Sequence, residues 1–148
     1  FPKSRTVNGT IVMAPGDINL TFKRYLATPI RMTLKDDYVT DLEGEGADAA
    51  MMRAYLAAWG DREAYAVSHV GWGMNAGARW DAMTMYDKSQ HNGTELRAFA
   101  GNFLFSTGAN EFAGRFTPCH FDFPMRHCTV ELDGKVIVER GKLCEELR

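Results

Sequence analysis

A five-residue run between two prolines is the feature that most constrains how this chain can fold. The run is Cys119-His120-Phe121-Asp122-Phe123, and Pro118 and Pro124 flank it. On a β-strand, residues i and i+2 share a face, so the cysteine and both phenylalanines would face the core together. Because proline cannot donate a hydrogen bond to a β-ladder, we expect a short strand whose ends lie at the two prolines.

The other face of this expected strand carries His120 and Asp122. A neutral imidazole nitrogen and an anionic carboxylate oxygen, two residues apart on one face, can reach the same divalent metal ion. A lone His-x-Asp pair is a frequent chance match. The flanking prolines, the clean alternation and a further histidine strengthen the metal-site hypothesis.

That further histidine is His69, which lies in an apolar segment, Ala64–Val70, just before the glycine-rich stretch Gly71–Gly77. We expect the segment to be a buried strand with Tyr65, Val67 and His69 on one face. The competing interpretation of His69 is a core histidine that bonds to the backbone. His91 lies in a polar loop and is expected to have no role, and His127 is expected at the surface.

Together, His69, His120 and Asp122 would be a set of two imidazoles and one carboxylate. This is the facial triad of non-haem Fe(II) oxygenases, which leaves open positions on the metal. The same donors can hold catalytic zinc. A third hypothesis is a non-catalytic oligomerisation module in which the three residues are structural. Cys119 is expected to be buried with the phenylalanines and inert as a nucleophile.

Composition excludes several classes of protein. The chain has 148 residues, of which 45% are hydrophobic and 24% charged, as in an ordinary globular domain. Its net charge of −2 gives no general electrostatic reason to bind nucleic acid, and no apolar run is long enough for a membrane helix. Three cysteines without CxxC spacing argue against a disulfide scaffold, so we expect a cytoplasmic location.

Local patterns predict an α+β fold, with a mixed, mainly antiparallel sheet, several hairpins and one main helix. Turn signals predict three hairpins. They span Thr6–Met13, Pro29–Leu42 and Thr129–Glu139, with turns at Asn8-Gly9, Asp36-Asp37 and Asp133-Gly134. The helix is expected at Ala47–Trp59, with an apolar stripe formed by Met51, Tyr55, Leu56 and Trp59. Glu95–Ser106 is expected to be a long strand.

The chain opens on Phe1-Pro2-Lys3 without an initiator methionine. We therefore expect residues 1–148 to be a single metal-binding catalytic domain, the C-terminal domain of a larger two-domain protein.

Three segments resemble the C-terminal half of the 2,5-dihydroxypyridine 5,6-dioxygenases. They are Ala66–Asn75, Cys119–Phe123 and the hairpin around Val130–Gly134. These bacterial enzymes act in nicotinate and nicotine degradation and are distantly related to the aminopeptidase T family of metallopeptidases. The resemblance covers most of the chain and is strongest from about Gly44 onward.

The resemblance implies that His69, His120 and Asp122 are ligands of Fe(II). The expected partners are a small dihydroxylated aromatic substrate and O₂, whose two oxygen atoms would be inserted across a ring bond to give an open-chain amide acid. Further copies of the chain are expected as well, as a homo-oligomer. The histidines that such enzymes use for proton handling would lie upstream of Phe1, so this domain alone is expected to be catalytically incomplete.

Three residues after His69 are candidates for the substrate pocket. Trp72 could stack on a pyridine ring, Asn75 lies in the same loop, and Arg79 could neutralise a phenolate-like oxygen. The competing interpretation makes Trp72 a core residue and Arg79 a surface residue.

The alternative function is a zinc- or cobalt-dependent aminopeptidase of the aminopeptidase T type. That family needs two metal ions and further glutamate and histidine ligands. This chain has His69 where the glutamate is expected, and Phe99–Gly108 contains no histidine. Too few ligands therefore remain for a two-metal site.

Overall fold

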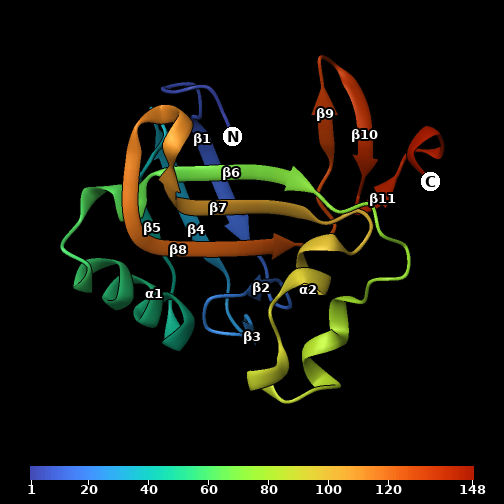
Figure 1. Cartoon of the computed structure of the whole chain (residues 1–148), viewed down its shortest axis with the longest axis horizontal. Helices are drawn as coiled ribbons and strands as arrows, with labels where there is room; N and C mark the ends of the chain where they lie inside the picture. The colour runs from blue at the N-terminus through green and yellow to red at the C-terminus, as the bar shows by residue number, and fades with distance from the viewer.

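Two three-stranded antiparallel sheets form the centre of the molecule (Figure 1). The computed structural model describes all 148 residues, Phe1–Arg148. The first sheet has the order β1-β4-β5, formed by Gly9–Met13, Ile30–Lys35 and Tyr38–Glu43. The second has the order β6-β7-β8, formed by Val67–Trp72, Phe103–Asn110 and Arg115–Met125. In Figure 1, β6–β8 run across the view in front of the steeper strands of the first sheet.

Smaller elements surround these sheets. The remaining strands form a β2-β3 pair and a β9-β10-β11 sheet, with bounds Ile18–Asn19, Arg24–Tyr25, Val130–Leu132, Lys135–Glu139 and Lys142–Leu143. The α-helices are α1, Gly46–Ala58, and α2, Thr94–Ala98. Short 3₁₀ helices span Arg62–Tyr65, Trp80–Thr84, Lys88–Gln90, Glu111–Ala113 and Glu145–Leu147. The predicted α+β class, with mainly antiparallel pairing and one main helix, is confirmed. None of the helices has the length and hydrophobicity that spanning a bilayer requires.

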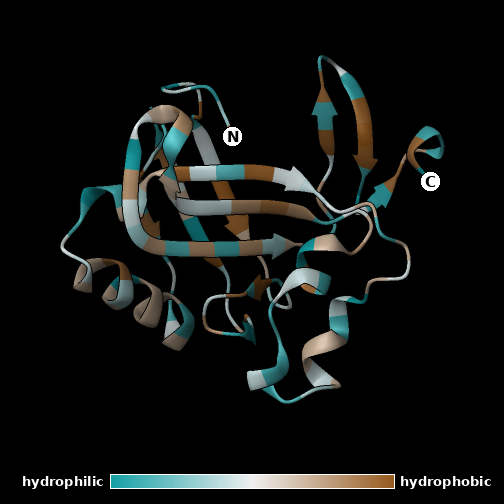
Figure 2. Cartoon of the chain, viewed as in Figure 1, coloured by the Kyte–Doolittle hydropathy of each residue, from teal (hydrophilic) through white to brown (hydrophobic).

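The main hydrophobic core lies between the two large sheets and α1. Along the strands, apolar and polar residues alternate, as the colours of Figure 2 show. Cys119, Phe121 and Phe123 all belong to the core cluster, so the predicted apolar face of β8 is confirmed. The rings of Phe121 and Phe123 stack with centroids 5.2 Å apart, and Phe121 also meets the edge of Tyr55 on α1 at 5.0 Å. The aromatic face of β8 therefore joins the second sheet to the main helix.

Two of the three predicted hairpins are confirmed. β4 and β5 pair through the turn Asp36-Asp37, whose φ angles are +48° and +76°. β9 and β10 pair through Asp133-Gly134, at +50° and +80°. Both central residues of each turn are left-handed, as in the tight turns that match strand twist.

The predicted hairpin at Thr6–Met13 is wrong, because β1 pairs with β4 and not with the residues before Asn8. The Asn8 side chain instead accepts a hydrogen bond from the backbone N–H of Asp36, at 2.9 Å. The buried Asp37 carboxylate accepts the N–H groups of Arg5 and Val7, at 2.5 and 2.9 Å. These side-chain bonds hold the residues before β1 against the β4–β5 turn, so this segment is fixed without forming a hairpin with β1.

The boundaries of three predicted strands are also wrong. The expected strand Ala64–Val70 begins only at Val67, because Ala64 and Tyr65 belong to a 3₁₀ helix. β8 continues through Pro118 and Pro124 to Met125, which is possible because it is an edge strand of its sheet and proline is tolerated there. Glu95–Ser106 is not one strand: its first residues belong to α2, and β7 begins only at Phe103. The small residues between them form the turn that separates the two elements.

The predicted helix is confirmed as α1, but only part of its predicted stripe is buried: Leu56 lies in the core and Tyr55 packs against it. Met52 and Leu56 are fully buried, whereas Met51 and Trp59 are 37% and 38% exposed. Asp48 is buried on the same stripe, where it accepts the backbone N–H of Ala27 at 2.7 Å and pairs with Arg24 at 2.9 Å. The buried face of the helix therefore contains a bonded carboxylate beside Met52 and Leu56, which hydrophobicity alone does not predict.

Phe121→Ala should destabilise the fold by about 3–5 kcal/mol, because it removes a fully buried ring from the contact between β8 and α1. The matched control is Phe116→Ala on the same strand, where the ring is 69% exposed. Urea unfolding followed by circular dichroism measures both. Equal midpoints for the two variants would contradict this description of the core.

Candidate metal centre

The register between β7 and β8 positions the candidate ligands. Ser106 on β7 lies directly opposite Asp122 on β8, and Gly108 lies opposite His120. His120 and Asp122 therefore project from the sheet face that is opposite to Phe121 and the core. This arrangement agrees with the alternation expected from the sequence.

Gly108 is required for this pairing. Its φ is +119°, and a Cβ atom at this position would lie 2.2 Å from the carbonyl oxygen of Cys119. Any side chain would therefore force β7 and β8 apart beside His120.

A β-bulge in β6 brings His69 to the same face. Val67 pairs with Thr107 and Val70 with Phe105, so Ser68 and His69 together oppose the single residue Ser106. A bulge of this kind re-aims side chains locally. The sequence prediction that Val67 and His69 share a face is consequently wrong: Val67 is in the core, while His69 faces Ser106, whose Oγ lies 3.0 Å from its Nε2.

The donor atoms of His69, His120 and Asp122 converge, all lying within 4.8 Å of one another. Asp122 Oδ1 lies 3.2 Å from His120 Nε2 and 3.5 Å from His69 Nε2. The two imidazole rings stack with centroids 5.6 Å apart. Two ligands at right angles on a metal, each at about 2.1 Å, would lie about 3.0 Å apart. The residues present therefore fit a single divalent ion.

Asp122 is held as a buried carboxylate with several partners. Its side chain is 2% exposed, and Oδ2 accepts a hydrogen bond from Nε of Arg97 at 2.6 Å and forms an ion pair with Nη2 of the same guanidinium at 2.5 Å. Ser106 donates a short hydrogen bond to Oδ1. Burial on its own would raise the pKa of Asp122, but hydrogen bonds from His120 and Ser106 and the charges of His120 and Arg97 hold this pKa well below its usual range. Asp122 is thus ionised at neutral pH, and Oδ1 is the oxygen that faces the imidazoles.

The orientation of His69 is set by its neighbour Ser68. The Ser68 hydroxyl donates to the carbonyl of Ala109 at 2.5 Å, so its oxygen can accept the Nδ1–H of His69, 3.3 Å away. This tautomer would leave Nε2 free to bind a metal ion. Without a metal, the Ser106 oxygen 3.0 Å away can accept an Nε2–H instead, because the hydroxyl hydrogen of Ser106 is donated to Asp122. Burial lowers the pKa of His69, more than the nearby Asp122 charge raises it, so the ring is neutral at neutral pH.

A polar cavity of about 290 Å³ opens beside His120 and Asp122. Leu20 is the one hydrophobic residue of its lining, and the polar side includes Arg97, His91, Asn92 and Lys23. The sequence analysis expected no role for His91, but the structure places it at this cavity. His127, by contrast, is exposed, as expected.

The structure does not bring Trp72, Asn75 and Arg79 to this cavity. Trp72 packs against the small cluster of Ile137, Val138 and Leu143. The Asn75 side chain caps its own turn by accepting the N–H of Gly77. The exposed Arg79 forms a two-pronged pair with Asp81, at 2.9 and 2.8 Å. Their assignment to a substrate pocket stays a prediction.

Comparison with known proteins gives the family. The family model described as NicX, 2,5-dihydroxypyridine 5,6-dioxygenase, matches residues 1–145. The chain belongs to the 2,5-dihydroxypyridine 5,6-dioxygenase family. A curated 2,5-dihydroxypyridine 5,6-dioxygenase of Pseudomonas putida KT2440 is 41% identical to it over 143 residues, which is 95% of this chain. A solved structure of 2,5-dihydroxypyridine dioxygenase from the same organism matches with a TM-score of 0.95 and 40% identity over 99% of this chain.

The chain spans only part of these relatives. It covers 41% of the length of the curated dioxygenase and 43% of the chain in the solved structure. Over the shared region, the matching family model and the TM-score of 0.95 confirm the family resemblance seen in the sequence motifs.

Sequence reasoning missed two residues that hold the site of this family member together. Arg97 was assigned to an expected strand but lies on α2, from which it reaches Asp122. Ser106 carried no motif, and only its register opposite Asp122 places it between the ligands. Both contacts join residues at least 16 positions apart, Arg97 from a helix and Ser106 through strand pairing, so no local pattern could have found them.

Cys119 should resist alkylation in the folded protein. It is 1% exposed, and burial raises its pKa to about 11, so hardly any thiolate forms at pH 8. Iodoacetamide treatment and peptide mass spectrometry should label the partly exposed Cys144 and leave Cys119 unmodified until urea is added. Rapid native labelling of Cys119 would reopen the thiol-nucleophile hypothesis.

Proposed function

We propose that this chain carries the metal-binding part of a mononuclear, Fe(II)-dependent dioxygenase that cleaves the ring of 2,5-dihydroxypyridine with O₂. The observation that carries the proposal is the convergence of His69, His120 and Asp122 on one face of the second sheet, in a chain that belongs to this family. The relatives named above are dioxygenases of that substrate.

The proposed ligands suit Fe(II). Two neutral imidazoles and one carboxylate leave a bound divalent ion with net positive charge, which favours approach of an anionic substrate hydroxyl. A bound Fe(II) ion supplies electron exchange with O₂, for which protein side chains have no equivalent. Because both atoms of O₂ enter the product across one ring bond, the overall reaction consumes no external reductant.

The surrounding residues prepare the site for this chemistry. Arg97 binds the Asp122 oxygen that points away from the imidazoles, which keeps the carboxylate ionised and its other oxygen in place. Ser106 spans His69 and Asp122 and restricts both. The polar cavity beside His120 is the proposed approach for substrate, with Arg97 and His91 as its polar contacts.

The aminopeptidase alternative is less well supported. The only cluster of three potential metal-ligating side chains contains a single carboxylate. A two-metal peptidase site needs bridging and terminal ligands beyond these three groups.

Two broader expectations accompany the proposal. All three cysteines are free, in keeping with a reducing cytoplasm. The aromatic side chains of Phe112 and Phe116 project into solvent, in keeping with a homo-oligomer that covers them.

His120→Ala and Asp122→Asn should each weaken Fe(II) binding by more than about 100-fold, because each removes a direct ligand. The control is His127→Ala, which deletes an exposed histidine. Anaerobic equilibrium dialysis with metal analysis measures one ion per chain in the parent and in the control. Unchanged binding in both ligand variants would exclude this site, and tight binding of two zinc ions would favour the aminopeptidase.

Arg97→Gln should weaken Fe(II) binding by about 10–100-fold, because Asp122 loses the partner that orients it. Arg79→Gln removes the same charge from an exposed arginine that pairs only with Asp81, and it should leave metal affinity unchanged. The same dialysis measures both. Equal affinities in the two variants would show that Arg97 does not position the carboxylate.

A further inference from the structure

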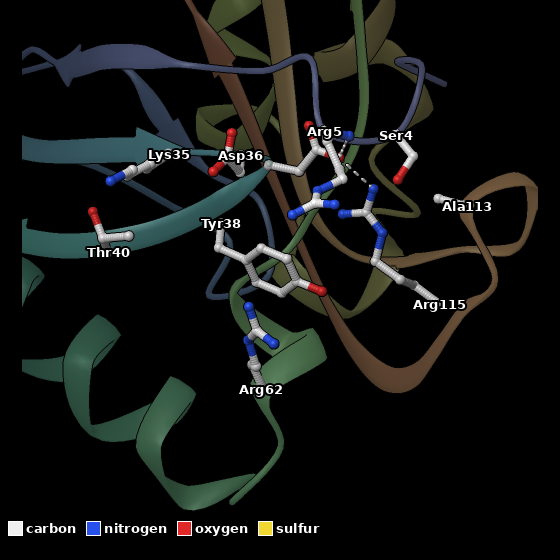
Figure 3. A pocket seen from close by; sticks show the side chains of 10 residues that line it. Ser4, Arg5, Lys35, Asp36, Tyr38, Thr40, Arg62, Ala113 and Arg115 are labelled. Atoms are coloured by element: carbon white, nitrogen blue, oxygen red, sulfur yellow. Dashed lines mark hydrogen bonds and ion pairs between the residues drawn. The ribbon is translucent and has the colours of Figure 1, made fainter.

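A second cavity, separate from the candidate metal centre, opens beside the β4–β5 turn (Figure 3). Its volume is about 460 Å³, within the range of about 300–1,000 Å³ typical of small-molecule sites. It shares no lining residue with the cavity at His120 and Asp122. Ten residues line it: Ser4, Arg5, Lys35, Asp36, Asp37, Tyr38, Thr40, Arg62, Ala113 and Arg115.

The charge of this cavity is unbalanced. Four basic and two acidic side chains line it, an excess of two positive charges. Asp37 is already committed at the base of the cavity, because it pairs with Arg115 at 2.8 Å and accepts the N–H groups of Arg5 and Val7. Burial on its own would raise the pKa of Asp37, but these backbone bonds and Arg115 together lower it, so its charge is present at neutral pH.

The other three cations have no carboxylate partner. The side chains of Arg5, Lys35 and Arg62 form no ion pair with any residue of the chain, whereas four other partly or fully exposed arginines each pair with a carboxylate. At the base of the cavity, the charges of Arg115 and Asp37 are paired with each other, whereas the basic side chains of its walls have no carboxylate partner. An anion is the ligand that would complement these walls.

Two of the guanidinium groups are held in place by an aromatic ring. The Arg62 guanidinium lies 4.1 Å from the centre of the Tyr38 ring, and that of Arg115 lies 5.7 Å from it. Glu63 accepts the Tyr38 hydroxyl at 3.1 and 3.2 Å, which fixes the ring. A guanidinium that stacks on a ring through its face keeps its N–H edge available for hydrogen bonds.

Arg5 completes the arrangement. Figure 3 shows the guanidinium groups of Arg5 and Arg115 side by side next to Tyr38, with Arg62 below the ring. Adjacent guanidinium groups repel one another unless negative oxygens lie between them. Arginine forks match the oxygens of carboxylate and phosphate groups with paired hydrogen bonds.

We propose that this cavity binds a small organic anion through a carboxylate or phosphate group, with Arg5 and Arg62 as the principal contacts and Arg115 as the fixed base. Lys35 contributes a further positive charge to the lining. The size of the cavity accommodates a molecule larger than a single inorganic ion. The site is independent of the proposed dioxygenase centre.

The test is titration of the protein with malonate and, separately, with inorganic phosphate, at constant ionic strength set with sodium chloride. Calorimetry gives stoichiometry and affinity, and amide chemical shifts locate the site. We expect saturable binding of one anion per chain, with shifts at residues 35–40 and 113–115. Stronger binding of malonate identifies a carboxylate ligand, and stronger binding of phosphate identifies a phosphorylated one.

Arg62→Gln and Arg5→Gln should each weaken the binding by about 10-fold or more, because each removes a charged donor. Both side chains are exposed, so the variants should fold, and unfolding midpoints check this. Arg31→Gln is the matched control: it removes the same charge from an exposed arginine on β4 that lies outside the cavity. Iron binding should be unchanged in all three variants. Non-saturable binding, shifts elsewhere, or equal losses in the control would overturn the proposal.

Discussion

The pairing of β7 with β8 is the constraint on which the candidate metal centre depends. It places Ser106 opposite Asp122 and Gly108 opposite His120, while the alternate residues of both strands enter the core. A shift of one residue would exchange the two faces, burying the ligands and exposing the phenylalanines. The hydrophobic core and the site are therefore specified by the same register. The core phenylalanines of β8 therefore help to position the candidate ligands, although their side chains lie on the opposite face of the sheet.

The second consequence of that register is a buried carboxylate that must be compensated. An isolated charge with 2% exposure would be strongly unfavourable, so Asp122 requires the hydrogen bond and ion pair with Arg97 and the hydrogen bond from Ser106. With Oδ2 satisfied by the guanidinium, Oδ1 is the atom left to face His69 and His120. The partners that make burial possible also select the oxygen that a metal would bind.

β8 takes part in two ion pairs that each join a buried aspartate to an arginine. At its start, Arg115 pairs with the buried Asp37, and seven residues later Asp122 pairs with Arg97. In the first pair the arginine belongs to β8, and in the second the carboxylate does. The first pair ties the N-terminal segment to the β4–β5 turn and forms the base of the basic cavity. The second joins α2 to the sheet beside the candidate ligands.

The sequence alone was sufficient for features that depend on neighbours along the chain: the β4–β5 and β9–β10 turns, the main helix, and the alternation that put His120 and Asp122 on one face. Motif resemblance also predicted the family. Tertiary structure decided the rest. The bulge that turns His69 toward Ser106, the reach of Arg97, and the pairing of β1 with β4 all arise from contacts between distant segments. Periodicity describes which side of an element is apolar, but a bulge changes that side and a long-range partner fixes the register, and neither leaves a local pattern.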